Sequence, residues 1–520
     1  ARPRAEEARG PARRQVLMAA RRVRLGAEAR GALAKVFAAA RQPVWLVGGS
    51  IRDAALGRPF GDLDLACADA RALAAQLARA FKGTLVTLDE TNAVYRLVLM
   101  PARGKALKQI DIAGLQGKTI LEDLGRRDFT VNAAALELTK ELPPSLPESA
   151  FIDPRGGLKD LAAGVLRADI EQNLSDDPLR LLRAVRLAAQ LGLTIDAKTL
   201  KAIKRRCRLI QVPAAERVAA ELLMLLAVPG ASSWLALMDE HALLTAVFPE
   251  LEPARRCAED YYGPGGVLKH TLEVCARVDF LLTNLRTVYR PLAGDLEAHI
   301  AQRGGPPFRA LLLLAALLHD VAKPETAKKV DGRLRFFEHD TKGAVLTEKI
   351  LRRLRLSRDQ IGTASAIVRQ HLRPGHLAAG GPLTERAAYR FFRDLGEDAP
   401  GLLIVCWGDH ASYLPEARLK RLLKTAAADV KRADLSAFKP EDARKTVHHL
   451  QLVSTLLRRW RDLSRAPAPE RLLDGRDVMK ALKLPPGPRI GELLERVREA
   501  QAEGEVKNRD EAIALISRLK

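Results

Sequence analysis

The sequence predicts an α+β protein whose α/β part occupies about the first 140 of its 520 residues and is followed by helices. Two observations favour this class. Short apolar runs bounded by turn residues, which are typical of buried strands, are concentrated in the first part. From about residue 158 onward, apolar residues recur at the spacing of a helix. The composition, with 47% hydrophobic and 28% charged residues, is globular and excludes a chain that is disordered throughout.

The first part is expected to contain five strands. The first, Val44–Val47, follows a proline and stops at the pair Gly48-Gly49, so it reads as a buried strand that enters a tight turn. A short helix is expected over Ile51–Leu56. The other expected strands are Gly61–Leu65, Thr84–Leu88, Val94–Leu99 and Gln109–Ala113. A segment with three prolines, residues 143–147, then ends the alternation.

The rest of the chain is expected to be helical. Pro178–Leu191, Ala197–Cys207 and Ala214–Leu226 carry helical apolar spacing, and Phe308–Leu318 is an apolar helix. Segments rich in glycine and proline at 263–266, 304–307 and 466–469 separate these helices into groups. We therefore expect five parts: a basic arm with a first helix (1–40), an α/β head (41–145), a helical neck (146–250), a further helical domain (251–420) and a helical tail (421–520).

The net charge of +22 indicates a polyanionic partner, with nucleic acid as the first candidate and an anionic membrane surface as the second. Membrane insertion is excluded, because the longest apolar run, Ala310–Leu318, is about half the roughly 20 residues of a spanning helix. Five scattered cysteines without a C-x-x-C motif indicate a reducing, cytoplasmic setting. The first 41 residues hold eleven Lys or Arg and three Glu; for the arm, contact with RNA and a solvated tail both stay open.

A first group of polar residues suits phosphate chemistry. The turn Gly48-Gly49-Ser50 stands between a strand and a helix, where backbone N–H groups can approach an anion. Asp62 and Asp64 follow on the next strand, and residues two apart on a strand point to the same face. Two acids that face one way repel each other unless a divalent cation lies between them. This pattern predicts two-metal phosphoryl chemistry, with Asp111 as a third carboxylate from a neighbouring strand.

These segments resemble the class II tRNA nucleotidyltransferases, the CCA-adding enzymes and their bacterial poly(A) polymerase relatives, which have a head of the polymerase-beta type. Four later segments match the same family in order: RRDFTVNA at 126–133, DPRGGLKDL at 153–161, DDPLRLLR at 176–183, and Glu216-Arg217 with Glu221-Leu222. In the third of these, Asp176 stands where the family usually has Glu. The resemblance implies that Mg²⁺ is bound by Asp62 and Asp64, with Asp111 assisting as a ligand or base.

The resemblance also implies how the nucleotide is bound. The triphosphate is expected at Gly48, Gly49, Ser50 and Arg52, and the ribose and phosphate at Arg127, Asp128 and Asn132. Further triphosphate or primer contacts are expected from Arg183 and Arg186. Asp177 and Arg180 would read the base: three apart on a helix, they share a face, and together they match the edges of cytosine and adenine but not those of guanine and uracil. An ion pair within the helix is the competing interpretation.

The interval between Asp111 and Arg126 holds 14 residues, which is shorter than in full CCA-adding members and resembles members that add only CC. The expected partners are tRNA and CTP, together with ATP if the final adenosine is also added. Poly(A) polymerase or an A-adding enzyme is the alternative within the family. A phosphohydrolase with a non-catalytic RNA-binding head and a non-catalytic tRNA-binding protein are the alternatives from other classes. The sequence does not define the oligomeric state.

A second group of residues lies in the helical domain at 251–420. Imidazole and carboxylate side chains together suit Mg²⁺ or a divalent transition metal. Their order, His270, His319-Asp320 and Asp409, resembles the HD phosphohydrolase superfamily, and His339 and His371 fall where ligands of a second metal occur in such domains. A working phosphodiesterase or phosphatase is favoured over a decayed structural domain.

Overall fold

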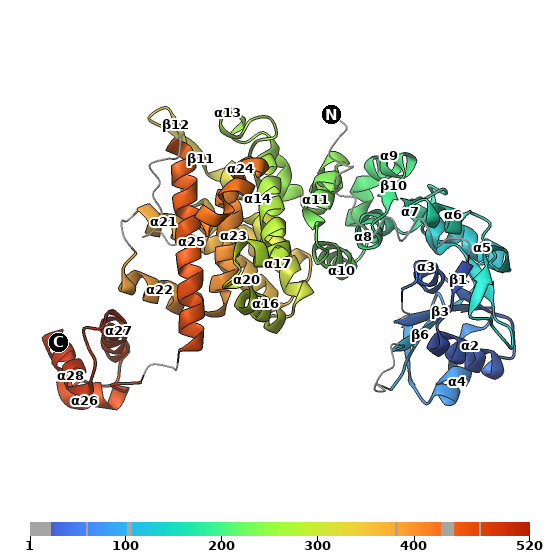
Figure 1. Cartoon of the computed structure of the whole chain (residues 1–520), viewed down its shortest axis with the longest axis horizontal. Helices are drawn as coiled ribbons and strands as arrows, with labels where there is room; N and C mark the ends of the chain where they lie inside the picture. Colours follow the sequence, from blue (N-terminus) through green and yellow to red (C-terminus); the bar gives the residue numbers. More distant parts are fainter. Residues whose placement is uncertain are drawn as a thin grey trace. The chain divides into compact units, whose positions relative to one another are not determined.

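The computed structural model describes residues 22–58, 61–100, 107–379, 383–427, 441–466 and 470–519. Its backbone divides into two compact units: Ala1–Leu225 with Leu237–Val247, and Leu226–Ala236 with Phe248–Lys520 (Figure 1). Most of the basic arm, residues 1–21, lies outside the described residues. The finer division into five parts stays a prediction. The class is confirmed, with a mixed α/β head followed by mostly helical regions.

A six-stranded sheet organises the first unit. Its strand order is β4-β5-β6-β3-β2-β7, and β3–β6 is its parallel pair, the other neighbours being antiparallel. The bounds are β2 (Val44–Val47), β3 (Asp62–Cys67), β4 (Thr84–Asp89), β5 (Val94–Val98), β6 (Gln109–Gly114) and β7 (Ala135–Glu137). The five strands expected from apolar runs are all present. The three-residue strand β7 was not expected.

Helices cover the sheet on both faces. α2 (Ala27–Ala39) and α4 (Ala70–Phe81) bury their apolar residues in the larger core, against alternate residues of β3, β5 and β6. A smaller core on the other side joins Val47 and Ala66 to Ile120 and Leu124 of α5 (Ile120–Arg126). Because residues alternate along β3, Leu63 and Leu65 are buried while Asp62 and Asp64 point to the opposite face.

The neck follows the sheet as a series of helices. These include α6 (Gly157–Ala162), α7 (Asn173–Asp176), α8 (Arg180–Leu191), α9 (Ala197–Arg206) and α10 (Ala215–Leu226). The helix expected at Pro178–Leu191 is present as Arg180–Leu191, but the expectation that Asp177 lies on its face was wrong. Asp177 has extended backbone angles, φ −132° and ψ 93°, because the ring of the following proline disfavours the helical region for the residue before it.

The second unit is a group of helices around a buried centre. Its main elements are α14 (Gly266–Thr283), α17 (Pro306–Leu318), α19 (His339–Arg353), α20 (Arg358–Gln370), α23 (Ala399–Ser412) and α25 (Glu441–Arg465). Every side chain of α17 from Phe308 to Leu318 is buried. Among the described residues, no single helix is long and apolar enough to cross a membrane, although the bent pair Ala293–Gln302 and Pro306–Thr326 passes by length and composition.

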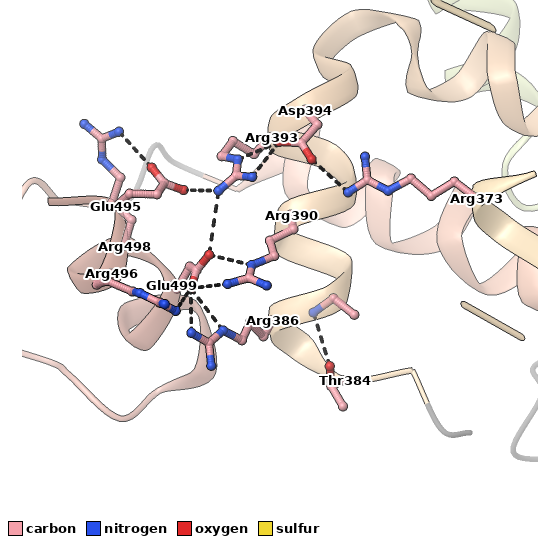
Figure 2. A network of polar contacts seen from close by, with 11 residues as sticks. Arg373, Thr384, Arg386, Arg390, Arg393, Asp394, Glu495, Arg496, Arg498 and Glu499 are labelled. Atoms are coloured by element: carbon pink, nitrogen blue, oxygen red, sulfur yellow. Dashed lines mark hydrogen bonds and ion pairs between the residues drawn. The ribbon is translucent and has the colours of Figure 1, made fainter. Parts of the chain in front are cut away.

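The last helices form a small module with its own apolar core, made of α26 (Gly475–Leu482), α27 (Pro488–Glu503) and α28 (Arg509–Arg518). α27 contacts α22 (Glu385–Leu395) through two carboxylates, Glu495, which pairs with Arg393, and Glu499, as Figure 2 shows. Glu499 is only 4% exposed and accepts from Arg386 (Nη2 to Oε2, 2.7 Å) and from Arg390 (Nη2 to Oε2, 2.8 Å). Arg496 of α27 itself donates to the same carboxylate.

Replacing Glu499 is therefore expected to loosen the module. Hydrogen bonds, first of all from Arg390, lower the pKa of Glu499 from 4.5 to about 2. Its contribution to docking is thus complete above about pH 4.5 and is lost as the pH falls toward 2. Glu499→Gln should cost about 2 kcal/mol, speed amide exchange in α27 at neutral pH and remove this acid dependence. Glu492→Gln, on the same helix and paired within the described residues with Arg489 alone, should change neither. Equal amide-exchange rates in α27 of the two variants would contradict the role of Glu499 in holding α27 against α22.

Candidate active site and candidate metal centre

The turn after β2 brings the backbone of Gly48 and Gly49 against the carboxylate of Asp64. Gly48 has φ 64°, and a Cβ there would lie 2.9 Å from a guanidinium nitrogen of Arg127. A Cβ on Gly49 would lie 3.1 Å from Asp64 Oδ2. Ser50 fixes the turn to β3, because its backbone N–H donates to Asp64 Oδ2 (3.1 Å) and its hydroxyl accepts from the backbone N–H of Asp64 (2.8 Å). Glycine is therefore required at both positions, 48 and 49, because a Cβ at either would crowd the side chain of Arg127 or Asp64.

The carboxyl of Asp64 faces this turn from β3, and its pKa is shifted. Burial raises its pKa first, and repulsion from Asp111 raises it further, against the hydrogen bond from Ser50 and the charges of Arg127 and Arg52. Asp111 stands opposite Asp64 because β3 and β6 pair in parallel register. Asp62 is exposed and lies two residues before Asp64, on the same face of β3. A cation at this point would relieve the repulsion, which fits the expected Mg²⁺.

Asp111 is held by an arginine that sequence reasoning missed. Arg96 of β5 donates from Nε to Asp111 Oδ1 and from Nη2 to Oδ2, both at 2.8 Å. The antiparallel register of β5 and β6 sets these residues directly opposite each other. This hydrogen bonding raises the pKa of Arg96, so its guanidinium stays charged. The alternation of the segment VYRLV places Arg96 on the same face as its neighbours at 94 and 98. Its pairing with Asp111 could be inferred only once the strand register was known.

A chain of polar contacts links the turn to the neck. Arg52 Nη1 donates to Asn132 Oδ1 (2.8 Å), and Asn132 Nδ2 donates to Asp128 Oδ1 (2.9 Å). Arg183 of α8 lies 3.6 Å from Asp128 Oδ2. Burial alone would raise the pKa of Asp128, but Arg183 and the hydrogen bond from Asn132 outweigh it and lower the pKa. The carboxyl of Asp128 is therefore ionised and can accept from a hydroxyl.

Two arginines of α8 share one buried carboxylate. Glu221 of α10 is 5% exposed and accepts from Arg183 Nε (3.1 Å) and from Arg186. Sequence reasoning placed Glu221 in a matched segment without a role. Arg127, also expected at the nucleotide, donates from Nε and Nη2 to Asp123 Oδ2 at 3.0 and 2.9 Å. The expected arginines are thus held in place by acids from neighbouring elements.

The two expected base-reading residues are close in the chain, but their side chains point to different partners. Asp177 Oδ2 accepts from Arg217 Nη2 (3.1 Å) of α10. Arg180 Nη1 donates to the carbonyl of Asn173 (3.0 Å), while its Nε is buried without a hydrogen-bond partner. The intrahelical ion pair is not formed, because Asp177 precedes the helix.

In the second unit, the expected HD residues come together from separate helices. Two groups of three have ligand atoms within 4.8 Å of one another: His270 with His319 and Asp409, and Asp320 with His339 and His371. Among the described residues, these are the groups that meet this distance. Asp320, 1% exposed, lies between them, with Oδ2 at 3.1 Å from His319 Nε2 and Oδ1 at 3.5 Å from His339 Nε2.

The imidazoles are oriented for metal binding. Nδ1 of His319, His339 and His371 lies 2.6–2.7 Å from the carbonyls of Ala316, Phe336 and Val368. A proton held on Nδ1 by a carbonyl leaves the Nε2 lone pair free. Burial, followed by repulsion from His319, lowers the pKa of His371 to about 4, so its ring is neutral at pH 7. Nε2 of His270, His319 and His339 and both oxygens of Asp320 are buried, and their near partners are one another, Asp409 and Lys323, so the donor set fits one or two divalent ions.

A lysine that sequence reasoning missed completes this centre. Lys323 Nζ lies 2.6 Å from Asp320 Oδ2 and donates to the hydroxyl of Tyr262 (2.9 Å). The ring of Tyr262 is stacked on His270, with centroids 4.8 Å apart. The spacing from Asp320 to Lys323 is one helical turn, which could have indicated the contact.

Comparison with known proteins matches four parts of the chain. Family models match in order: the poly A polymerase head domain at 44–167, the probable RNA and SrmB-binding site of polymerase A at 192–255, the HD domain at 286–436 and the putative tRNA nucleotidyltransferase domain 2 at 438–516. The A-adding tRNA nucleotidyltransferase of Deinococcus radiodurans is 33% identical over 91% of this chain and 94% of its own.

Two further proteins extend the comparison. The CC-adding enzyme of Thermus thermophilus is 32% identical over 90% of this chain and 92% of its own. The Thermotoga maritima CCA-adding enzyme, solved in complex with tRNA, has the same fold, with a TM-score of 0.58 at 20% identity over 98% of both chains. Since the identity to the Deinococcus enzyme spans nearly the whole chain, this protein belongs to the family of tRNA nucleotidyltransferases, with an HD domain behind its head.

Proposed function

We propose that the first unit adds cytidines to tRNA 3′ ends from CTP by two-metal nucleotidyl transfer, and stops after CC. The observation that carries the mechanism is the buried Asp64, which faces the glycine turn and stands in register with Asp111. Asp62 and Asp64 would hold Mg²⁺, which when bound lowers the pKa of the attacking hydroxyl and neutralises the triphosphate. Arg52 and the backbone of Gly48 and Gly49 would bind the phosphates.

The remaining residues would select the nucleotide. Ionised Asp128 would accept from the ribose 2′-hydroxyl, which favours an NTP over a dNTP, and Arg183 and Arg186 would contact the triphosphate or primer. Asp177 would accept from the exocyclic amine of the base, and Arg180, whose Nε has no partner, would donate to the ring acceptors. For this, Arg217 has to release Asp177 or share it with the base.

The choice between CC and CCA rests on the short interval 112–125. α5 occupies much of it, and Asp123 binds both Arg127 and the backbone N–H of Gln116, so little free chain is left to rearrange the pocket. Relatives of similar identity are named for A-addition and for CC-addition, so similarity alone does not decide. The geometry of α5 favours CC.

A second activity is proposed for the HD centre. His270, His319 and Asp409, with Asp320, His339 and His371, would hold divalent metal, which when bound supplies an activated water for phosphoester hydrolysis. Lys323 would stabilise negative charge on the phosphate. The oriented imidazoles and the neutral ring of His371 support this function, because they leave Nε2 lone pairs available to a metal.

Product length tests the base choice. tRNA lacking CCA should gain two cytidines with labelled CTP alone and stay at CC when ATP is added. The physical reason is that the pocket has no long loop to switch from C to A. Electrophoresis of the labelled tRNA resolves each added nucleotide. Full CCA would contradict the short-interval argument, and a long A tract would indicate a poly(A) polymerase.

Separate variants test the two centres. Asp64→Asn should lower addition by 10³-fold or more, a rough size for loss of a metal-holding charge, and leave hydrolysis of bis-p-nitrophenyl phosphate intact. Asp409→Asn should lower the bound metal per chain, measured by elemental analysis, and the hydrolysis, while addition continues. Loss of both activities in either variant would contradict two independent sites.

Arg180→Ala tests the reading of the base. We expect roughly a 10- to 100-fold loss of preference for CTP over UTP, the size of one lost bidentate contact, with little change in tRNA affinity. Arg205→Ala serves as the control, because Arg205 is a neck arginine paired with Glu171 and 57% exposed. Unchanged nucleotide preference in Arg180→Ala would refute the template role.

A further inference from the structure

A basic hairpin stands beside the HD centre, and no motif predicted it. β11 (Ala327–Val330) and β12 (Arg333–Phe336) pair antiparallel. They are joined by Asp331-Gly332, both with positive φ, as a tight hairpin turn requires. Its strands carry Lys328, Lys329, Arg333 and Arg335, all of them exposed.

Two positive charges of this hairpin lie opposite each other and destabilise the strand pair. Lys328 lies directly opposite Arg335, and Val330 opposite Arg333, so three cations share one face of the ribbon. Like charges at opposed positions destabilise a strand pair. None of the four cations forms an ion pair within the described part of the chain, and Asp331 in the turn is the single acid between residues 327 and 337. An anionic partner would remove this repulsion.

The base of the hairpin belongs to the wall of the metal centre. The carbonyl of Phe336 is the partner of His339 Nδ1 at 2.7 Å. The ammonium of Lys323, which contacts Asp320, lies 5.3 Å from the centre of the Phe336 ring. A polyanion lying along the hairpin would therefore end at the HD residues.

Exposed aromatic side chains accompany the cations. Phe337, the residue after β12, is 55% exposed, and Tyr261 is 70% exposed next to Tyr262, whose ring is stacked on His270. Cations that follow a backbone, interleaved with exposed rings on which bases stack, are the recognition chemistry of single-stranded nucleic acid. A duplex would use the cations and leave the rings without a partner.

We propose that the β11–β12 hairpin binds a single-stranded RNA segment and leads its end to the HD centre. The part that concerns delivery rests on the proposed phosphohydrolase function; the RNA-binding surface does not. Lys328, Arg333 and Arg335 contact successive phosphates, and Phe337 stacks on a base. The ligand of the HD centre is accordingly an RNA end with unpaired nucleotides before it.

The test is the double variant Lys328→Gln/Arg335→Gln in the full chain. Removing an opposed like-charge pair leaves the hairpin fold intact. The probe is a fluorescein-labelled ten-nucleotide oligoadenylate, followed by anisotropy across a salt series. Two lost phosphate contacts should reduce the slope of log K against log salt by about 1.4 and weaken binding about ten-fold. Phe337→Ala should weaken binding roughly five-fold or more and leave the slope unchanged.

The matched control is Lys349→Gln/Arg358→Gln, which removes the same charge from exposed positions on α19 and α20. It should leave slope and affinity near those of the unaltered chain. An equal loss in control and hairpin variants, or no loss in the hairpin variant, would overturn the proposal. Duplex RNA bound as tightly as the oligoadenylate, with Phe337→Ala silent, would also overturn it, because the surface would then read phosphates alone.

Hydrolysis separates this proposal from the function on which it rests. The hairpin variant should cleave bis-p-nitrophenyl phosphate at the unaltered rate but release less phosphate from an oligoadenylate that ends in a 3′-phosphate. If the unaltered chain cleaves neither substrate, the phosphohydrolase function and the delivery fail, and the anisotropy series still decides whether the hairpin binds RNA.

Discussion

The head depends on holding a buried carboxyl, that of Asp64, beside a second one. Asp64 and Asp111 stand in register on the parallel pair β3 and β6, and such a pair is costly unless its charge is offset. The surrounding residues supply that offset. Arg96 binds Asp111 with two hydrogen bonds, and the backbone N–H of Ser50 donates to Asp64. The glycine turn is shaped by the same need, since a Cβ on Gly49 would lie 3.1 Å from the Asp64 carboxylate.

The same offsetting extends from the head into the neck. Arg52 is tied through Asn132 to Asp128, which faces Arg183, which in turn binds Glu221. Each of these contacts joins a hydrogen-bond donor or cation to an acceptor or anion elsewhere in the chain. Residues expected at the triphosphate, the ribose and the primer therefore cannot shift independently. A substitution at Glu221 would be expected to affect Asp128 through Arg183, which contacts both carboxylates.

Much of the fold could be predicted from local patterns. The strand Val44–Val47 and the helix at 308–318 are runs whose burial requires no knowledge of their partners. The missed elements are short and depend on distant partners. β7 has three residues and is defined by its pairing with β2. The β11–β12 hairpin is exposed, so it has no buried apolar face from which a sequence pattern could predict it. Asp177 was misplaced because helical spacing was given more weight than the proline that follows it.

The candidate sites followed the same division. Acids and histidines were found by type and order, because metal chemistry limits the choice of residues. Arg96, Arg217 and Lys323 were missed, because an ion pair is visible only once register and packing are known. Lys323 shows what such a partner changes. The charge of His319, followed by the ammonium of Lys323, lowers the pKa of Asp320 against burial. Asp320 is thus ionised beside positive groups, whereas in the head burial, followed by repulsion from Asp111, raises the pKa of Asp64. The two centres therefore differ in what a bound cation would do: in the head it would relieve repulsion between acids, and in the HD centre it would compete with Lys323 for Asp320.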